Sequence, residues 1–249
     1  MNLKKSIIIG LAVMAAFSSF GCGDSGQKSS GGFRVVTRPQ TPQQKAEAEE
    51  ALSQGRSYFA TGKYSEAIDS FTKAINAKEN NAYIYYERGH AYEGLEDIPS
   101  AIADYTTAIN TGKTKIKQYE QDSNDPDLNT VMGLGEAAFR RGYIYHQQRD
   151  LINAIEDYTK VIDLCIARGN KFSVPPIVCA SSYNNRGNCY CDQGDFARAI
   201  ADYSKAIEIG RNPIYYRNRG IAHQQLGNEA QAEADLAMAQ ELEEKNAKK

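Results

Sequence analysis

The stretch ADYSKAI, residues 201–207, has three close copies earlier in the chain. They read DSFTKAI at 69–75, ADYTTAI at 103–109 and EDYTKVI at 156–162. Each copy begins two residues after an alanine, and a fifth unit carries an alanine at the equivalent place. These five alanines are Ala67, Ala101, Ala154, Ala199 and Ala232, separated by 34, 53, 45 and 33 residues. A 34-residue period with insertions of 19 and 11 residues and one deletion explains this spacing, so one unit occurs five times.

Other positions recur with the same period when the alanine is numbered 20. Position 8 is glycine in every unit, position 24 is aromatic in four, and position 27 is alanine or valine. Position 11 is tyrosine except in the fifth unit, where it is His223. Small residues at positions 8 and 20 let two helices cross closely, and the rings fill the space beside them. This pattern resembles the tetratricopeptide repeat, a helix–turn–helix unit of 34 residues.

The resemblance implies an all-α superhelical solenoid of about five repeats that stack on one another. The expected repeats lie at about 48–81, 82–115, 135–168, 180–212 and 213–246. Thr41, Pro42 and Gln44 have the spacing of a capping box with proline at the first helical position, so we expect the domain to span 41–249. Position 16 supplies N-caps for the second helices of repeats two to five: Asp97, Asp150, Asp195 and Asn228.

The first 21 residues have the features of an export signal. Two lysines precede an apolar stretch that is too short to span a bilayer. Residues 19–22, SFGC, resemble the lipobox of bacterial lipoproteins, in which the cysteine is diacylated and becomes the mature N-terminus. This predicts a lipid on Cys22, a flexible tether over 22–40, and a place in the cell envelope, with the outer membrane facing the periplasm favoured. An ordinary signal peptidase site nearby is the alternative.

Opposite charges recur together at positions 7 and 23 of repeats two to five. Position 7 is always arginine and position 23 always aspartate, whereas repeat one has Gln54 and Ser70 at these places. We therefore expect the arginine and the aspartate of one repeat to pair between its two helices. Shared ancestry of the four repeats would also explain the correlation.

The two insertions fall near residues 116–134 and 169–179. Acidic residues around Asp125 suggest calcium, but the EF-hand positions for glycine and glutamate hold Asp127 and Gly133, so a solvated loop flanked by lengthened helices fits better. Pro175 and Pro176 suggest that the second insertion is extended. Cys165 ends one repeat and Cys179 starts the next, so we expect them to form a disulfide. A four-cysteine metal site with Cys189 and Cys191 is the alternative.

Composition and motifs argue against catalysis and against nucleic-acid binding. The chain of 249 residues has 29 basic and 31 acidic residues, so it lacks the basic excess of nucleic-acid-binding domains. The three histidines lie in three different repeats, and the chain contains neither a G-x-S-x-G motif nor a complete phosphate-binding loop. We expect no catalytic residues, no metal and no cofactor.

Binding remains, and the family resemblance implies where it occurs. Related proteins bind partners on the concave face formed by positions 2, 5, 6, 9, 12 and 13 of the first helices. The residues expected to bind a partner there are Tyr83, Tyr86, His90, Phe139, Arg140, Tyr143, Asn184, Asn188 and Arg217. The expected function is a membrane-tethered adaptor or scaffold for a protein or peptide in the cell envelope. The alternatives are a pilotin-like assembly factor for a secretin or a type IV pilus machine, an envelope hydrolase, and a structural spacer.

Tyr86, Phe139 and Tyr143 are the strongest candidates for anchoring a partner. They occupy positions 5, 5 and 9 of repeats two and three. Aromatic side chains dominate the energy of many interfaces, which favours these three as a cluster on the binding face. The alternative is that the first insertion separates these repeats and buries the rings against its own helices.

Overall fold

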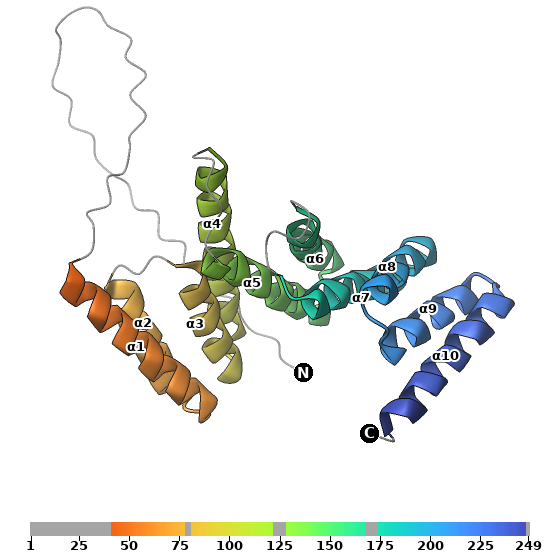
Figure 1. The fold of residues 1–249 in the computed structure, drawn as a ribbon, viewed down its shortest axis with the longest axis horizontal. Coiled ribbons are helices and arrows are strands. Elements are labelled where there is room, and N and C mark those ends of the chain that lie inside the picture. Colours follow the sequence, from red (N-terminus) through yellow and green to blue (C-terminus); the bar gives the residue numbers. More distant parts are fainter. Residues whose placement is uncertain (1–40, 78–80, 122–127, 168–173, 248–249) are drawn as a thin grey trace, which may run out of the picture. The chain divides into compact units, whose positions relative to one another are not determined.

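The computed structural model describes residues 41–77, 81–121, 128–167 and 174–247. These residues form helices and no strand, which confirms the all-α class and the solenoid of helix–turn–helix units (Figure 1). None of these helices has the length and apolar character needed to cross a membrane. The helices are α1 (Pro42–Ala60), α2 (Tyr64–Asn76), α3 (Ala82–Gly94), α4 (Ile98–Gln121), α5 (Leu128–Gln147), α6 (Leu151–Ile166), α7 (Pro176–Asp192), α8 (Phe196–Ile209), α9 (Pro213–Gln225) and α10 (Glu229–Ala247).

Successive helices pack against each other, and each predicted repeat contains one pair, from α1 with α2 to α9 with α10. The predicted cap of the first helix is present. The Thr41 side chain accepts from the Gln44 backbone while the Gln44 side chain accepts from the Thr41 backbone. Asp97, Asp150 and Asp195 also cap their helices. The Asn228 side chain instead lies 3.3 Å from Nδ1 of His223.

The core of each repeat is the crossing of its two helices. Phe71, Tyr105, Tyr158 and Tyr203, all at position 24, are at most 2% exposed. The position 8 glycine lies against this ring, and a Cβ atom added to Gly187 would come within 2.7 Å of Tyr203. A larger residue therefore has no room at this crossing, as the repeat pattern predicted.

The predicted arginine–aspartate pairs are confirmed in repeats two to five. In repeat three, Nε and Nη2 of Arg141 donate to the two carboxylate oxygens of Asp157 at 2.7 and 2.8 Å. The arginine also donates from Nη1 to the Thr106 hydroxyl of repeat two at 2.6 Å. The same three contacts occur at Arg88 with Asp104 and Thr72, at Arg186 with Asp202 and Thr159, and at Arg219 with Asp235 and Ser204.

Each arginine therefore joins three helices in two repeats. Its acceptor hydroxyl lies at position 25 of the preceding repeat, a link that the sequence pattern did not reveal. The Thr106 hydroxyl donates to the Ile102 carbonyl at 2.7 Å, so its lone pairs face Arg141. The contacts form a ladder of charge-assisted hydrogen bonds that fixes how neighbouring repeats stack.

The two insertions meet in one apolar cluster. The first insertion lengthens α4 and α5, as expected, and Ile116, Val131 and Leu134 from these extensions pack with Val174 and Cys179. The acidic centre of this insertion, residues 122–127, lies outside the described part of the chain. The described ends of the two insertions therefore share one apolar cluster.

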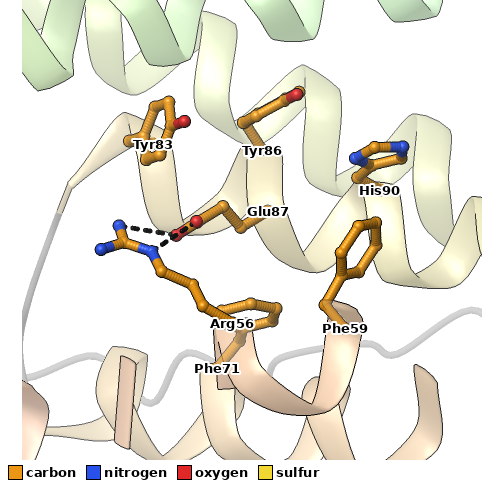
Figure 2. Close-up of a pocket in the computed structure, with 7 residues that line it drawn as sticks. All are labelled: Arg56, Phe59, Phe71, Tyr83, Tyr86, Glu87 and His90. Carbon is orange, nitrogen blue, oxygen red and sulfur yellow. Dashed lines mark hydrogen bonds and ion pairs between the residues drawn. The ribbon is translucent and has the colours of Figure 1, made fainter. Parts of the chain in front are cut away.

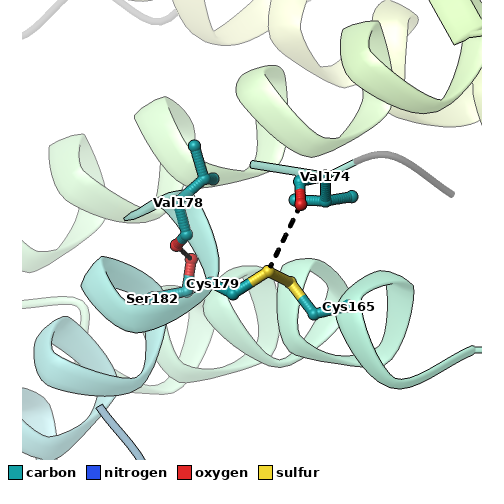
Figure 3. Close-up of a disulfide and its surroundings, with 5 residues drawn as sticks. All are labelled: Cys165, Val174, Val178, Cys179 and Ser182. Atoms are coloured by element: carbon teal, nitrogen blue, oxygen red, sulfur yellow. Dashed lines mark hydrogen bonds between the residues drawn. A yellow bond between two sulfur atoms is a disulfide. The ribbon is translucent and has the colours of Figure 1, made fainter. Parts of the chain in front are cut away.

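A disulfide closes the second insertion (Figure 3). It joins Cys165 near the end of α6 to Cys179 in the first turn of α7, with the Cα atoms 6.0 Å apart. The prediction of an extended segment at both prolines is wrong for Pro176. Only Pro175 is extended, because Pro176 takes the first position of α7, where a missing backbone N–H is harmless.

Candidate functional site

The first helices of the repeats carry the predicted binding face, and the structure forms a pocket at its N-terminal end. The pocket lies between α1 of repeat one and α3 of repeat two and has a volume of about 200 Å³. Three of the predicted residues line it: Tyr83, Tyr86 and His90. Glu87 also lines it and occupies position 6 of repeat two, one of the expected binding positions. The other three were not predicted: Arg56, Phe59 and Phe71 (Figure 2).

The missed residues of repeat one were recognisable in the sequence. Arg56 and Phe59 occupy positions 9 and 12 of repeat one, which belong to the same face as the residues named in repeats two to five. The prediction assigned no binding residue to the first repeat. The first repeat therefore contributes to the pocket, although it lacks the arginine–aspartate pair of the other four repeats.

One wall of the pocket is an ion pair between repeats. Nε and Nη2 of Arg56 donate to the two carboxylate oxygens of Glu87 at 2.6 and 3.1 Å. The Arg56 side chain is 54% exposed and that of Glu87 only 13%. Burial raises the pKa of Glu87, and the hydrogen bond from Arg56 opposes this shift. The guanidinium therefore faces outward and neutralises a carboxylate that lies deeper.

The other walls are aromatic. The His90 ring centroid lies 4.6 Å from that of Phe59, and the Tyr86 centroid lies 5.3 Å from that of Tyr83 and 6.0 Å from that of His90. Burial and the nearby Arg140 lower the pKa of His90 to about 4. Burial and the charge of Glu136 raise the pKa of Tyr86 to about 12. Near neutral pH the histidine and both tyrosines are therefore uncharged.

The structure separates the predicted aromatic cluster of repeats two and three. Tyr86 turns to the pocket with repeat one. Phe139 packs against the cores of repeats two and three, and its ring centroid lies 5.8 Å from that of the buried Tyr158. Tyr143 is 47% exposed. Phe139 is thus a packed residue, because its ring contacts the buried Tyr158 between the helices of repeat three. Tyr143 remains exposed on the inner face.

Polar links connect the inner face from repeat to repeat. Arg140 of repeat three lies 3.5 Å from both oxygens of Glu93 in repeat two. Asp192 of repeat four accepts from Arg149 at 2.6 Å and lies 3.1 Å from Nε2 of His146. Like the Arg56 link, the contacts of Arg140 and His146 join neighbouring first helices, and Arg149 adds one from the turn between α5 and α6.

An amide network replaces the ion pair between repeats four and five. Asn218 Nδ2 donates to Oδ1 of Asn184 at 2.9 Å and of Asn188 at 3.2 Å. Tyr203 donates to the same Asn188 oxygen at 2.8 Å. Asn184 is only 6% exposed, so the prediction that it binds a partner directly is corrected. Its side chain instead links repeats four and five. Arg217 pairs with Glu243 of α10 at the surface.

The remaining cysteines and acidic groups do not form a metal site in the described part of the chain. No group of three or more His, Cys, Asp or Glu side chains there is arranged to hold a metal ion. Cys189 is buried, and burial raises the pKa of both Cys189 and Cys191. Raised pKa values keep these thiols protonated and therefore weakly nucleophilic.

Family models match segments of repeats one to four. A TPR repeat model matches residues 55–96, and two tetratricopeptide repeat models match residues 180–213 and, in two copies, 82–111 and 135–165. RNA polymerase II-associated protein 3 of Xenopus laevis is 31% identical over 121 residues, which are 47% of this chain and 16% of that protein. Hsp70-Hsp90 organizing protein 3 of Arabidopsis thaliana is 40% identical over 57 residues, 23% of this chain and 10% of that protein.

The match to each of these relatives thus covers a small part of its length. A solved structure, the crystal structure of MamA protein, superposes with a TM-score of 0.61 at 21% identity, covering 82% of this chain and 96% of that one. At this identity the likeness concerns the fold. The helix pairs, the recurring core positions and the matching models agree that residues 55–111, 135–165 and 180–213 of this chain form tetratricopeptide repeats.

Proposed function

We propose that the chain is an adaptor that binds a protein or peptide segment on its inner face while a lipid on Cys22 tethers it to an envelope membrane. Cys22 lies outside the described residues, and the anchor rests on the likeness of residues 19–22 to a lipobox. The outer membrane facing the periplasm is the proposed location. Two acyl chains would hold the chain at the membrane more firmly than one.

The inner-face pocket is the observation that carries the proposed binding role. It combines an aromatic wall with an outward-facing arginine, and aromatic residues and arginine are enriched among the groups that dominate binding energy. On the inner face of repeat three, Tyr143 exposes a large ring that is not part of the buried core. One similar protein, Hsp70-Hsp90 organizing protein 3, has a name that describes the organizing of Hsp70 and Hsp90, which is consistent with a protein partner.

A crosslinking experiment in intact cells tests this function. A photoreactive amino acid replaces Tyr143 on the inner face or, as a matched control, Ile152 in α6 of the same repeat, which is 77% exposed. Irradiation should join one discrete partner to the chain through position 143 and not through 152. Equal crosslinking at both positions, or none at 143, would contradict the proposed binding face.

A further inference from the structure

We propose that the pocket between repeats one and two receives one uncharged aromatic side chain from an extended partner segment, and that Arg56 binds a carboxylate beside that ring. This inference rests on the proposed adaptor function and specifies the chemistry of the partner. It concerns internal residues of the partner and requires no terminal carboxylate.

The size of the pocket fits a single side chain. About 200 Å³ equals the volume of about seven water molecules at roughly 30 Å³ each, close to the number of heavy atoms in a benzyl group. Pockets for drug-sized ligands are larger, at about 300–1,000 Å³. Five of the lining side chains are rings, which offer an incoming ring edge-to-face and offset contacts: Phe59, Phe71, Tyr83, Tyr86 and His90 (Figure 2).

The charges of the pocket select an uncharged occupant. Both carboxylate oxygens of Glu87 already accept hydrogen bonds from Arg56. His90 is neutral above its pKa of about 4. A cationic side chain inside the pocket would find Glu87 already paired with Arg56, and an anionic one would lie among the rings, because the Arg56 guanidinium faces outward at the rim. An aromatic ring loses little hydration and gains contact with the walls.

The rim of the pocket adds a requirement for a carboxylate. Arg56 uses Nε and Nη2 for Glu87, and its Nη1 group has no hydrogen bond within the described residues. The guanidinium carbon lies 5.8 Å from the centroid of the Tyr83 ring. The planar fork of arginine suits a carboxylate oxygen at this edge. Arg56 is the charged cation among the seven lining residues, so the partner's carboxylate belongs at its edge.

The absence of tryptophan from this chain makes the inference measurable. The probe is a Gly/Ser peptide with a central Trp-Asp pair, acetylated at its N-terminus and amidated at its C-terminus. Tryptophan fluorescence then comes from the peptide alone. We expect the emission to shift to the blue and to saturate as the full chain is added. Replacing the peptide's Asp by Asn should weaken binding about threefold to tenfold, and Lys should weaken it further.

Three variants of the chain decide between the outcomes. Tyr83→Ala removes a wall and should weaken binding at least tenfold. Ile152→Ala, which changes an exposed side chain of α6 outside the pocket and outside the inner face, should change it less than twofold. Arg56→Gln alters a half-exposed side chain and should abolish the preference for Asp over Asn while the blue shift remains. Circular dichroism melts confirm that each variant is folded.

Several results would overturn the inference. These are an emission that does not shift, a shift that survives Tyr83→Ala, and a preference for Asp that survives Arg56→Gln. If the crosslink at position 143 forms in cells while the peptide fails, the adaptor function stands and the pocket assignment is wrong. If the crosslink is absent, the adaptor function itself fails, whatever the peptide does.

Discussion

Arg141 and Asp157 are joined by two hydrogen bonds of 2.7 and 2.8 Å, and the Asp157 side chain is 1% exposed. Arg141 extends this pair to Thr106 of the preceding repeat, and Lys160 adds a second cation at 2.8 Å from Asp157. The pair therefore lies where two repeats and three helices meet. Its loss should affect the stacking of repeats as well as the hairpin that contains it.

Asp157→Ala should lower the free energy of unfolding by about 3–5 kcal/mol, because it leaves a partly buried guanidinium without its counter-charge. Urea denaturation monitored by circular dichroism measures this loss. The control is Arg198→Ala, which breaks an exposed ion pair with Asp195 and should leave the stability within experimental error. Equal losses in the two variants would contradict the structural role of the buried pair.

Thr106→Val isolates the link between repeats. It removes the hydroxyl that accepts from Arg141 and keeps the side-chain shape, so we expect a loss of about 1.5–3 kcal/mol, as for a hydrogen bond to a charged group. In a double-mutant cycle with Arg141→Ala, the two losses should be less than additive. Strict additivity would mean that the hydroxyl and the guanidinium act independently.

The position 24 tyrosines should differ in what their hydroxyls contribute. The hydroxyl of Tyr105 donates to Glu93 at 2.6 Å, whereas the buried hydroxyl of Tyr158 has no hydrogen-bond partner within the described residues. Tyr158→Phe should therefore be neutral or stabilising, and Tyr105→Phe should cost about 1.5–3 kcal/mol. Thermal melts of the two variants measure the difference, and a larger loss at Tyr158 would contradict this assignment.

The partly buried His90 of the pocket should make the free energy of unfolding depend on pH. The pKa of His90 is about 4 when folded, below its ordinary value of 6.5, so between these values the unfolded chain binds more protons. The contribution of His90 is fully present above pH 6.5 and is lost as pH falls towards 4. Glu87 and Glu136, whose pKa values burial raises, act in the opposite sense.

Comparing wild type with His90→Gln separates these effects. The melting temperature of the variant should fall less steeply between pH 6.5 and 4 than that of wild type. Above pH 7 the difference between the two proteins should be constant. Identical pH profiles would show that His90 is protonated as readily in the folded chain as in the unfolded one.

The disulfide should stabilise the junction of repeats three and four. Cys165 and Cys179 are separated by 14 residues, and closing a loop of about 15 residues contributes about 3 kcal/mol. The double variant Cys165→Ala, Cys179→Ala should lose about this much, and reduced wild type should behave like it. Cys191→Ala is the control. Because Cys191 is a free cysteine, reductant should lower the stability of this variant by the same amount as that of wild type.

Much of the fold was predictable because the repeat period places the same residue types at the same contacts five times. The recurring arginine and aspartate even predicted the pairs within each hairpin. The role of the hydroxyl at position 25 was not predictable, because serine and threonine occur in helices for many other reasons. The structure shows that each of these hydroxyls accepts from an arginine of the next repeat.

The binding face was harder to predict because position alone does not tell how deep a side chain lies. Phe139 occupies the same repeat position as Tyr86, yet it packs onto Tyr158. Asn184 was expected on the surface, but Asn218 of the next repeat covers it. Both outcomes depend on how neighbouring repeats stack, which the pattern within one repeat does not encode.

The lipid anchor makes a prediction outside the described residues. Cys22→Ser removes the thiol that the lipid would modify and should leave an unprocessed or mislocalised precursor, detectable by its size and by membrane fractionation. Ser19→Ala, which keeps the cysteine, should be processed normally. A mature Cys22→Ser protein of unchanged size in the membrane fraction would contradict lipidation.

The most direct test of the account is the dissociation constant of the crosslinked partner for the Tyr143→Ala chain, measured beside its melting temperature. Tyr143 is 47% exposed and lies on the inner face, so its loss should hardly change the melting temperature. If this face binds the partner, the truncation should weaken binding by about 2 kcal/mol, roughly thirtyfold. An unchanged dissociation constant would contradict the inner face as the binding surface, as would a loss of affinity that merely follows a fall in melting temperature.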